Sequence, residues 1–276
     1  TNSIQNWLQQ FGTAQVQLNI DNNGKLDGSS LDFLTPLYED KKSILFTQLG
    51  VREQDNRITN NVGAGIRTFT RHWMYGGNAF FDNDLTGKNR RVGIGAEAWA
   101  DFVKFSSNTY MTSSNWHQSR DFTEYNETAA SGFDIRAEGY IPSYPHIGMR
   151  TMYEQYYGES VGLFGSDHLQ KDPSAVTVGL NYTPIPLVTL NIDHKRGQGA
   201  LKETKFKVDL RYSFGSAWSK QIDSTQVKNQ RILSYSRYDL VNRNNNIVLQ
   251  YKKKTQQSVF SLDLSVIVDN SPADGL

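Results

Sequence analysis

The chain has 276 residues, enough for one large domain or two ordinary domains with a sizeable core. The absence of cysteine excludes a disulfide framework and a thiolate metal site, and a formal net charge of +1 gives no indication of a nucleic-acid partner. No run approaches the roughly 20 apolar residues of a membrane helix, and the mean hydropathy is -0.58. A membrane barrel is still possible, because only alternate residues of its strands meet lipid.

The first predicted element is a short helix in SIQNWLQQFG, which ends at a glycine cap and defines residues 1–12 as a unit. Twelve stretches with strand character follow it. They span residues 13–20, 29–38, 43–52, 58–69, 74–82, 91–99, 102–112, 132–141, 147–156, 174–183, 187–196 and 204–214. Most of them alternate apolar and polar residues with a period of two, which is typical of a sheet with one apolar face.

The links between these strands alternate in length. Links after even-numbered strands are short (EDKK, TRHW, AD, PSYPH and TPIP), whereas links after odd-numbered strands are longer and more polar. An up-and-down barrel with short periplasmic turns and long outer loops predicts this alternation, and a Greek-key sandwich gives no reason for it. The sequence therefore predicts an all-β fold, a 12-stranded antiparallel transmembrane β-barrel over residues 13–214. A soluble β-sandwich with inward apolar faces is the alternative.

Two sets of side chains follow from this prediction. Aromatic residues collect near the short turns, where amphipathic rings favour the lipid–water boundary. The predicted aromatic belt comprises Trp73, Tyr75, Trp99, Tyr140, Tyr182 and Phe214. Polar residues of the opposite parity are expected to line a wet lumen. The predicted lumen-facing residues are Asp32, Glu97, Asp134, Arg136, Glu138, Glu154, Asp193, Asp209 and Arg211.

Several long motifs carry a resemblance to a known family. They are GSSLDFLTPLYE, GAGIRTF, FFDNDLTGKNRRVGIGAE, SGFDIRAEGYIPSYP, YEQYYGESVGLF, VGLNYTPIPLVTLNIDH and SRYDLVNRNNNIVLQYKK. From about Trp7 to Lys253 the chain resembles the translocation domain of the intimin and invasin family, the inverse autotransporters, and the resemblance to invasin looks closer.

The resemblance implies a barrel in the outer membrane of a Gram-negative bacterium, with the chain returning through its own lumen to display a C-terminal adhesin for host-cell attachment or invasion. The implied partners are outer-membrane lipid, the barrel assembly machinery and a host-cell receptor bound by the missing passenger.

The segment after the last strand changes character. Because an even number of strands leaves both barrel ends on one side, residues 215–241 are predicted to lie on the periplasmic side, with a short helix capped by Asp223 or Ser224. Residues 242–258 are polar and free of proline, and read as an extended linker. At roughly 3.3 Å per residue they reach about 56 Å, more than the hydrocarbon core of about 30 Å.

The linker is therefore expected to pass through the pore and to lower its ion conductance, which deletion of residues 242–258 is expected to raise. The predicted pore residues are Arg243, Asn244, Asn245, Asn246, Gln250, Tyr251, Lys252, Lys253 and Lys254. Their basic groups are expected to meet inward carboxylates, namely Glu97, Asp134, Glu138, Glu154 or Asp209. A solvated basic tail is the alternative. Residues 259–276 read as one strand at the start of an immunoglobulin-like passenger.

Catalytic patterns are weak. The five histidines are scattered, DNDLTG at residues 82–87 lacks the glutamate that completes a calcium loop, and the glycines of GAGIRT and GIGAE precede no helix. We expect no enzyme activity, metal or cofactor, and we interpret these inward glycines as room for the linker or other lumen contents. The alternative function is a gated porin or an outer-membrane barrel hydrolase with a periplasmic C-terminal tail.

Overall fold

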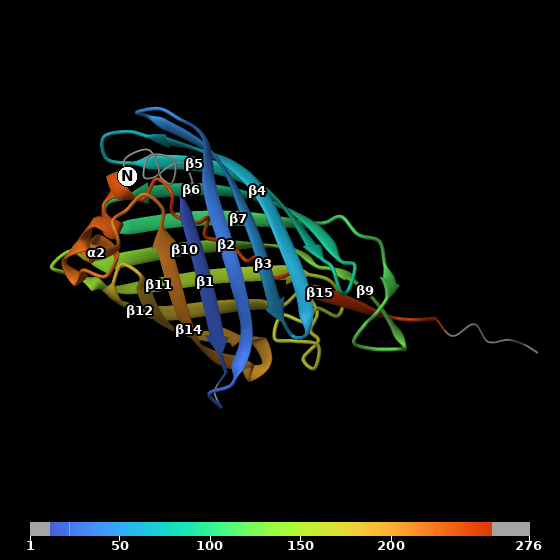
Figure 1. Ribbon diagram of the computed structural model, residues 1–276. Coiled ribbons are helices and arrows are strands. Elements are labelled where there is room, and N and C mark those ends of the chain that lie inside the picture. The colour runs from blue at the N-terminus through green and yellow to red at the C-terminus, as the bar shows by residue number, and fades with distance from the viewer. Residues whose placement is uncertain (1–11, 22, 256–276) are drawn as a thin grey trace, which may run out of the picture.

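The computed structural model describes residues 12–21 and 23–255 (Figure 1). The predicted N-terminal helix, the last three linker residues and the strand at 259–276 lie outside the described residues. Twelve antiparallel strands close into a barrel in the order β1-β14-β13-β12-β11-β10-β7-β6-β5-β4-β3-β2. Their bounds are β1 (Thr13–Ile20), β2 (Leu26–Glu39), β3 (Ser43–Gln54), β4 (Arg57–Phe69), β5 (Met74–Asp84), β6 (Arg90–Ala100), β7 (Val103–Thr112), β10 (Ser131–Ile141), β11 (Tyr144–Tyr157), β12 (Ser174–Ile185), β13 (Val188–Gly197) and β14 (Lys202–Ser213). The prediction of a twelve-stranded barrel is confirmed.

The barrel wall is apolar outside and polar inside. In β4, Val62 and Ile66 are 45% and 53% exposed, whereas Arg67, the next residue of the same strand, points into the barrel and is fully buried. Each strand repeats this period, because successive side chains point to opposite faces of a sheet. In a soluble sandwich the apolar faces of the strands are buried between two sheets, whereas here they are exposed on the outside. The sandwich alternative is therefore wrong.

The two ends of the barrel differ. The short links lie at one end together with both ends of the barrel chain, and the longer loops lie at the other (Figure 1). At the long-loop end a second sheet of three strands forms in the order β15-β9-β8, from β8 (His117–Gln118), β9 (Tyr125–Ala129) and β15 (Leu249–Lys253). This sheet differs from the prediction, in which residues 113–131 form a loop and the linker is an extended segment without a partner strand.

The segment after β14 folds over the short-turn end. It contains a short helix α2 (Trp218–Gln221) and two 3-10 helices, η3 (Ser224–Arg231) and η4 (Leu233–Tyr235); a third, η2 (Gln198–Ala200), lies in the β13–β14 loop. Asp223 caps η3 by accepting a hydrogen bond from the Thr225 backbone N–H at 2.9 Å, so the predicted cap is present on a 3-10 helix. Among the described residues, none of the helices has the length and apolar character needed to cross a bilayer.

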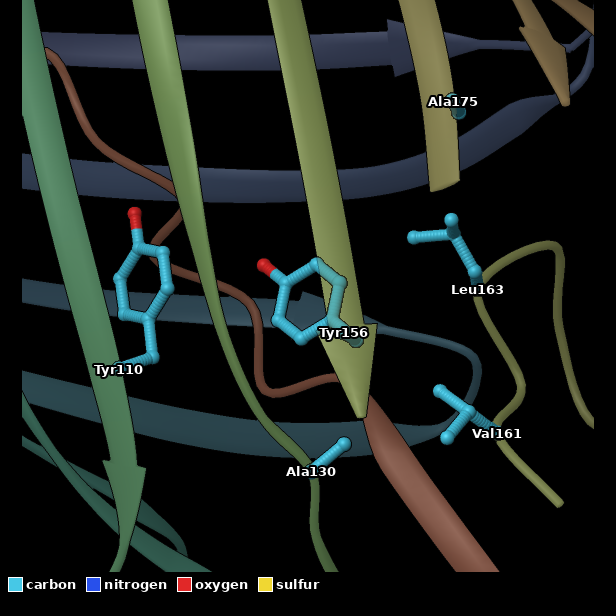
Figure 2. Close-up of a cluster of buried hydrophobic side chains, with 6 residues drawn as sticks. All are labelled: Tyr110, Ala130, Tyr156, Val161, Leu163 and Ala175. Carbon is cyan, nitrogen blue, oxygen red and sulfur yellow. The ribbon is translucent and has the colours of Figure 1, made fainter. Parts of the chain in front are cut away.

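Small apolar clusters lie inside the barrel. One surrounds Tyr110 and Tyr156 near the long-loop end (Figure 2) and has Val248 packed against it. A second joins Leu34, Ile44, Phe46 and Phe80 of the barrel to Val241, and a third joins Met74 and Trp99 to Leu233. Each cluster thus includes or touches a residue of the segment after β14. The interior apolar contacts of the barrel serve to hold that segment.

Candidate functional site in the lumen

Residues 237–248, here called the threaded segment, run through the barrel from the short-turn end to the long-loop end (Figure 1). Near the short turns, Arg67 donates to the Arg237 carbonyl at 2.9 Å. At mid-barrel, the Val241 N–H donates to Gln48 at 2.9 Å. At the far end, the Ala130 N–H donates to the Val248 carbonyl at 2.8 Å. The path connects the two ends of the lumen.

The segment that precedes it is tied to the short turns. Arg231 donates to the Pro145 carbonyl at 3.0 Å and to Thr183 Oγ1 at 2.8 Å, and its guanidinium lies 3.7 Å from the centroid of the Tyr140 ring. The Leu233 N–H donates to Asp101 at 2.7 Å. Three different short turns or strand ends are therefore bound by one short stretch of chain.

A buried ion pair anchors the middle of the threaded segment. Arg243 donates to both carboxylate oxygens of Asp82, at 2.8 Å and 2.7 Å, and the two side chains are 1% and 0% exposed. Asp82 also accepts from Arg91 at 2.8 Å and from Asn61 at 2.6 Å. The bidentate geometry fixes both the position and the orientation of the guanidinium. This contact sets the register of the threaded segment in the pore.

Aromatic rings frame the same contact. The Arg243 guanidinium lies 4.3 Å from the centroid of Phe80, and the Arg91 guanidinium lies 4.1 Å from the centroid of Tyr110. The Tyr110 hydroxyl donates to Asp134 at 2.6 Å and accepts from the Asn244 N–H at 2.7 Å. Ring faces are favourable partners for desolvated cations, so these contacts offset part of the cost of burying two guanidinium groups.

Amide side chains replace sheet pairing along the threaded segment. Asn61 donates to the Asn245 carbonyl at 2.9 Å, and Asn108 donates to the Asn242 carbonyl at 3.0 Å. The Asn244 side chain donates to the Tyr156 hydroxyl at 2.8 Å. Because an amide group both donates and accepts, these residues satisfy a buried backbone that has no neighbouring strand.

The chain leaves the lumen as β15. Gln250 donates to the Ala129 carbonyl at 3.3 Å, and Tyr251, which is 4% exposed, donates its hydroxyl to Asp121. Lys252 and Lys253 are exposed, and Lys254 donates to the Thr123 carbonyl at 2.8 Å. The expectation that these lysines meet inward carboxylates is wrong, because pairing with β9 carries them beyond the barrel wall.

The nine predicted lumen-facing residues all lie on the inner face of the barrel, where their partners are chiefly other barrel residues. The pairs are Asp32 with Arg52, Glu97 with Arg67, Asp134 with Arg136, Glu154 with Lys195, Asp193 with Arg150, Asp209 with Gln17, Glu138 with Tyr140, and Arg211 with Asp239. Among these nine, two bind the described part of the segment after β14: Arg211 binds Asp239, and Arg136 donates to Asn242 at 2.9 Å. The carboxylate that holds the linker, Asp82, was not predicted.

The predicted aromatic belt needs a correction. Trp73 stacks on the exposed Tyr75, Tyr182 is 42% exposed, and Phe214 contacts the outward Tyr212 ring. Trp99 and Tyr140 instead face the lumen. Trp99 is 1% exposed between the cations of Arg67 and Lys104, and Tyr140 lies against Arg231. Each follows an inward glutamate by two residues, so strand parity turns both rings inward.

The threaded segment follows one wall of the barrel. It binds chiefly side chains of β3 to β7, with further contacts to Arg136 of β10, Tyr156 of β11 and Arg211 of β14. A cavity of about 640 Å³ remains in the lumen. Much of the cavity lining comes from charged and amide residues of β1 and β11 to β14, including Gln17, Arg150, Asp193 and Lys207. The lumen is therefore narrowed by its own chain but not filled.

The barrel side of this anchor, Asp82 with Arg91, is absent from the predicted site residues. Asp82 and Arg91 pair directly across β5 and β6, and both lie on inward parity. Asp82 was read only as the start of a calcium-like loop. The sequence does contain a signal for this site. Asp82 has inward parity and lies opposite Arg91, and the linker contains a further arginine that could bind the same carboxylate. Glycine 93 was interpreted as room for lumen contents, and a Cβ there would lie 2.6 Å from Arg243 Nη2.

The sequence of the chain is similar to known proteins over most of its length. A family described as "Inverse autotransporter, beta-domain" matches residues 1–245. Intimin from Escherichia coli O127:H6 (strain E2348/69 / EPEC) is 51% identical over 264 residues, which is 96% of this chain and 28% of that protein. Invasin from Yersinia enterocolitica is 48% identical over 251 residues, 91% of this chain and 30% of that protein. These two identities are nearly equal, and the chain spans less than a third of either relative.

A solved structure has the same architecture. It comes from work titled "Unveiling the Mechanism Behind the in-meso Crystallization of Membrane Proteins" and is 51% identical to this chain. The similarity covers 88% of this chain and 100% of that one, with a TM-score of 0.85. The closed twelve-stranded barrel is thus shared with a membrane protein of closely related sequence.

Proposed function

The chain belongs to the inverse autotransporter β-domain family, and on that premise we propose that it anchors an adhesin passenger in the outer membrane and holds it in place for display on the cell surface. The barrel itself is an outer-membrane domain. The chain spans 28% of its intimin relative, and in this proposal the passenger begins after the linker, at residues 259–276. Receptor binding, for host-cell attachment or invasion, belongs to that passenger in this proposal.

The observation that carries the proposal is the threaded segment. It begins among the short turns, crosses the lumen and joins the outer sheet as β15, so that whatever follows Thr255 starts at the long-loop end. In outer-membrane barrels short turns face the periplasm and long loops face outward. That orientation gives residues 215–236 a periplasmic position and sends the passenger outside the cell.

The proposal also specifies partners. Lipid would contact the exposed apolar band, which includes Val62, Ile66, Leu180 and Ile192. Barrel assembly machinery would insert the domain, and nucleic acid has no role. We assign no reaction or cofactor to the chain, because its buried lumen carboxylates are paired with arginine, lysine or amide groups of the same chain. Such pairing favours an anchoring role for these groups over proton transfer.

An accessibility experiment tests the proposal against the porin or hydrolase alternative. An epitope is placed after Asp269 in the full-length protein, and intact cells are treated with a protease. Surface display predicts loss of the epitope, since the tail lies outside. As a matched control, the same epitope in the short turn at Lys41 and Lys42 is expected to survive until the outer membrane is opened. Protection of the Asp269 epitope on intact cells would favour a periplasmic tail.

A further inference from the structure

Three basic side chains gather on the outside of the barrel at the long-loop end of β13 and β14. Ile192 and Phe206 are 39% and 43% exposed and mark the lipid-facing parity of these strands. His194, Arg196 and Lys202 share that parity and are exposed as well. They therefore stand on the lipid-facing side, immediately beyond the apolar band, where the headgroups of the outer leaflet would lie.

Arg196 and Lys202 face each other with the same charge. They are direct partners in the register of β13 and β14, which brings their Cβ atoms to about 5 Å of each other. Like charges directly opposite on a sheet destabilise it. The adjacent carboxylates of Asp193 and Glu203 point into the lumen, where they bind Lys207 at 2.9 Å and Lys205 at 3.2 Å. Within the described part of the chain, no carboxylate forms an ion pair with either outward cation.

The local backbone forms a hollow around these cations. The β13–β14 loop turns through Gly199 and Ala200, both with positive φ, of 64° and 61°. A cavity of about 290 Å³ lies beside it and is lined by His194, Arg196, Ala200 and Lys202. His194 Nδ1 lies 2.9 Å from Thr204 Oγ1. This contact orients the imidazole on the same face of β13 as Arg196. A non-glycine residue in the left-handed region, as Ala200 is here, is uncommon.

From this arrangement we propose that His194, Arg196 and Lys202 form a binding site for the phosphate groups of an outer-leaflet lipid headgroup. A phosphate between the two opposed cations removes their repulsion, and a guanidinium binds phosphate oxygens in a bidentate manner. The acyl chains of the same lipid would lie on Ile192 and Phe206 below. The proposal rests on the orientation proposed above, with the long loops outside.

The test uses the full chain in zwitterionic detergent, titrated with diphosphoryl lipid A and followed by native mass spectrometry. The double variant Arg196→Gln/Lys202→Gln is expected to bind lipid A about thirtyfold more weakly, the loss expected for two cations at an anionic surface. Arg90→Gln is the matched control, because Arg90 is an exposed cation at the same end of β6 that faces Asn83 rather than a second cation. Arg90→Gln is expected to bind as the parent does. Arg196→Lys keeps the charge but loses the bidentate contact, so it is expected to bind more weakly than the parent and more tightly than Arg196→Gln.

Three outcomes would overturn the proposal: unchanged affinity in the double variant, equal affinity for lipid A without its phosphates, or an equal loss in Arg90→Gln. Inorganic phosphate distinguishes the source, since binding as tight as that of lipid A would assign the site to free phosphate and contradict a lipid site. Heat-shifted electrophoretic mobility verifies that each variant is a folded barrel. Because surface display is measured separately by epitope accessibility on cells, failure of the lipid site is distinguishable from failure of the proposed display function.

Discussion

Asp82 forms the buried ion pair that joins the barrel to the threaded segment. It binds Arg243 through both carboxylate oxygens and also accepts from Arg91 and Asn61, so one carboxylate faces two buried guanidinium groups. Breaking a buried pair by removing one partner leaves an uncompensated charge in a site of low dielectric. The cost of removing one partner therefore differs between the two. Asp82 is the carboxylate that pairs with Arg243, whereas Asp82 itself keeps Arg91 as a second cationic partner.

We predict that Asp82→Ala lowers the free energy of unfolding by about 3–5 kcal/mol, because it leaves both Arg91 and Arg243 without their carboxylate. Arg243→Ala is expected to cost less, since Arg91 and Asn61 still satisfy Asp82. Urea unfolding in lipid vesicles, followed by tryptophan fluorescence, measures both. Asp193→Ala is the control: it also removes a carboxylate that binds two cations, Arg150 and Lys207, but neither belongs to the threaded segment, so its cost should not change in an Arg243→Ala background. Equal losses in Asp82→Ala and Arg243→Ala would contradict this account.

Gly93 tests how closely the guanidinium fits. A Cβ at this position would lie 2.6 Å from Arg243 Nη2, so Gly93→Ala is expected to displace Arg243 and to cost about 1–3 kcal/mol of unfolding free energy. In an Arg243→Ala background the same change should cost little, because the clashing group is gone. Gly77→Ala is the matched control, since its nearest neighbour lies 3.9 Å away. Additive costs in the double variant would refute the proposed contact.

At the scale of elements, the twelve barrel strands could be predicted from the sequence because each one obeys a local rule. Period-two alternation indicates most of the strands, and the alternation of loop lengths indicates their arrangement. The same parity rule places Trp99 and Tyr140 inside, but nearness to a turn was given more weight. The sheet of β8, β9 and β15 follows no local rule, since β15 pairs with a segment that precedes it by about 120 residues and is too short to show a pattern.

The outer sheet is also where the threaded segment is fastened as it leaves the pore. The Tyr251 N–H donates to the Ser160 carbonyl at 2.9 Å, its ring centroid lies 5.3 Å from that of Phe122, and burial with the hydrogen bond to Asp121 raises the pKa of its phenol. β15 thus lies between β9 and the 158–162 loop. We call the contacts of Tyr251 with Ser160, Phe122 and Asp121 the clasp. They hold β15 independently of the ion pair between Arg243 and Asp82.

We predict that Tyr251→Ala opens this clasp without melting the barrel. Removing a buried aromatic side chain costs about 3–5 kcal/mol where it packs, and the loss should stay local because β15 forms no part of the barrel sheet. Hydrogen exchange of residues 249–255 should become faster while exchange in β4 and β5 stays unchanged. Lys253→Ala, on an exposed side chain of the same strand, should change neither rate. Faster exchange throughout the barrel would show instead that the clasp and the wall unfold together.

At the scale of the whole molecule, the barrel is a pore occupied by its own chain along one wall. The linker satisfies its backbone with lumen amides and its charge with Asp82, while a cavity of about 640 Å³ remains beside it. The cavity lining carries both signs of charge, including Arg150, Lys207, Asp193 and Asp209. We therefore expect ions to meet a narrow route lined by both signs of charge, and we expect the interactions that hold the linker in place to limit permeation.

We predict low single-channel conductance for the full chain in planar bilayers, and a marked rise when residues 242–258 are deleted. The deletion removes Arg243, which binds Asp82 of β5, and the asparagines that bind Asn61 of β4 and Tyr156 of β11, so the cross-section they occupy becomes water. Deletion of residues 259–276 is the matched control, since it shortens the chain but leaves the threaded segment in the lumen. Equal conductance in the parent and the 242–258 deletion would mean that the limiting constriction lies elsewhere, in the segment that covers the short-turn end.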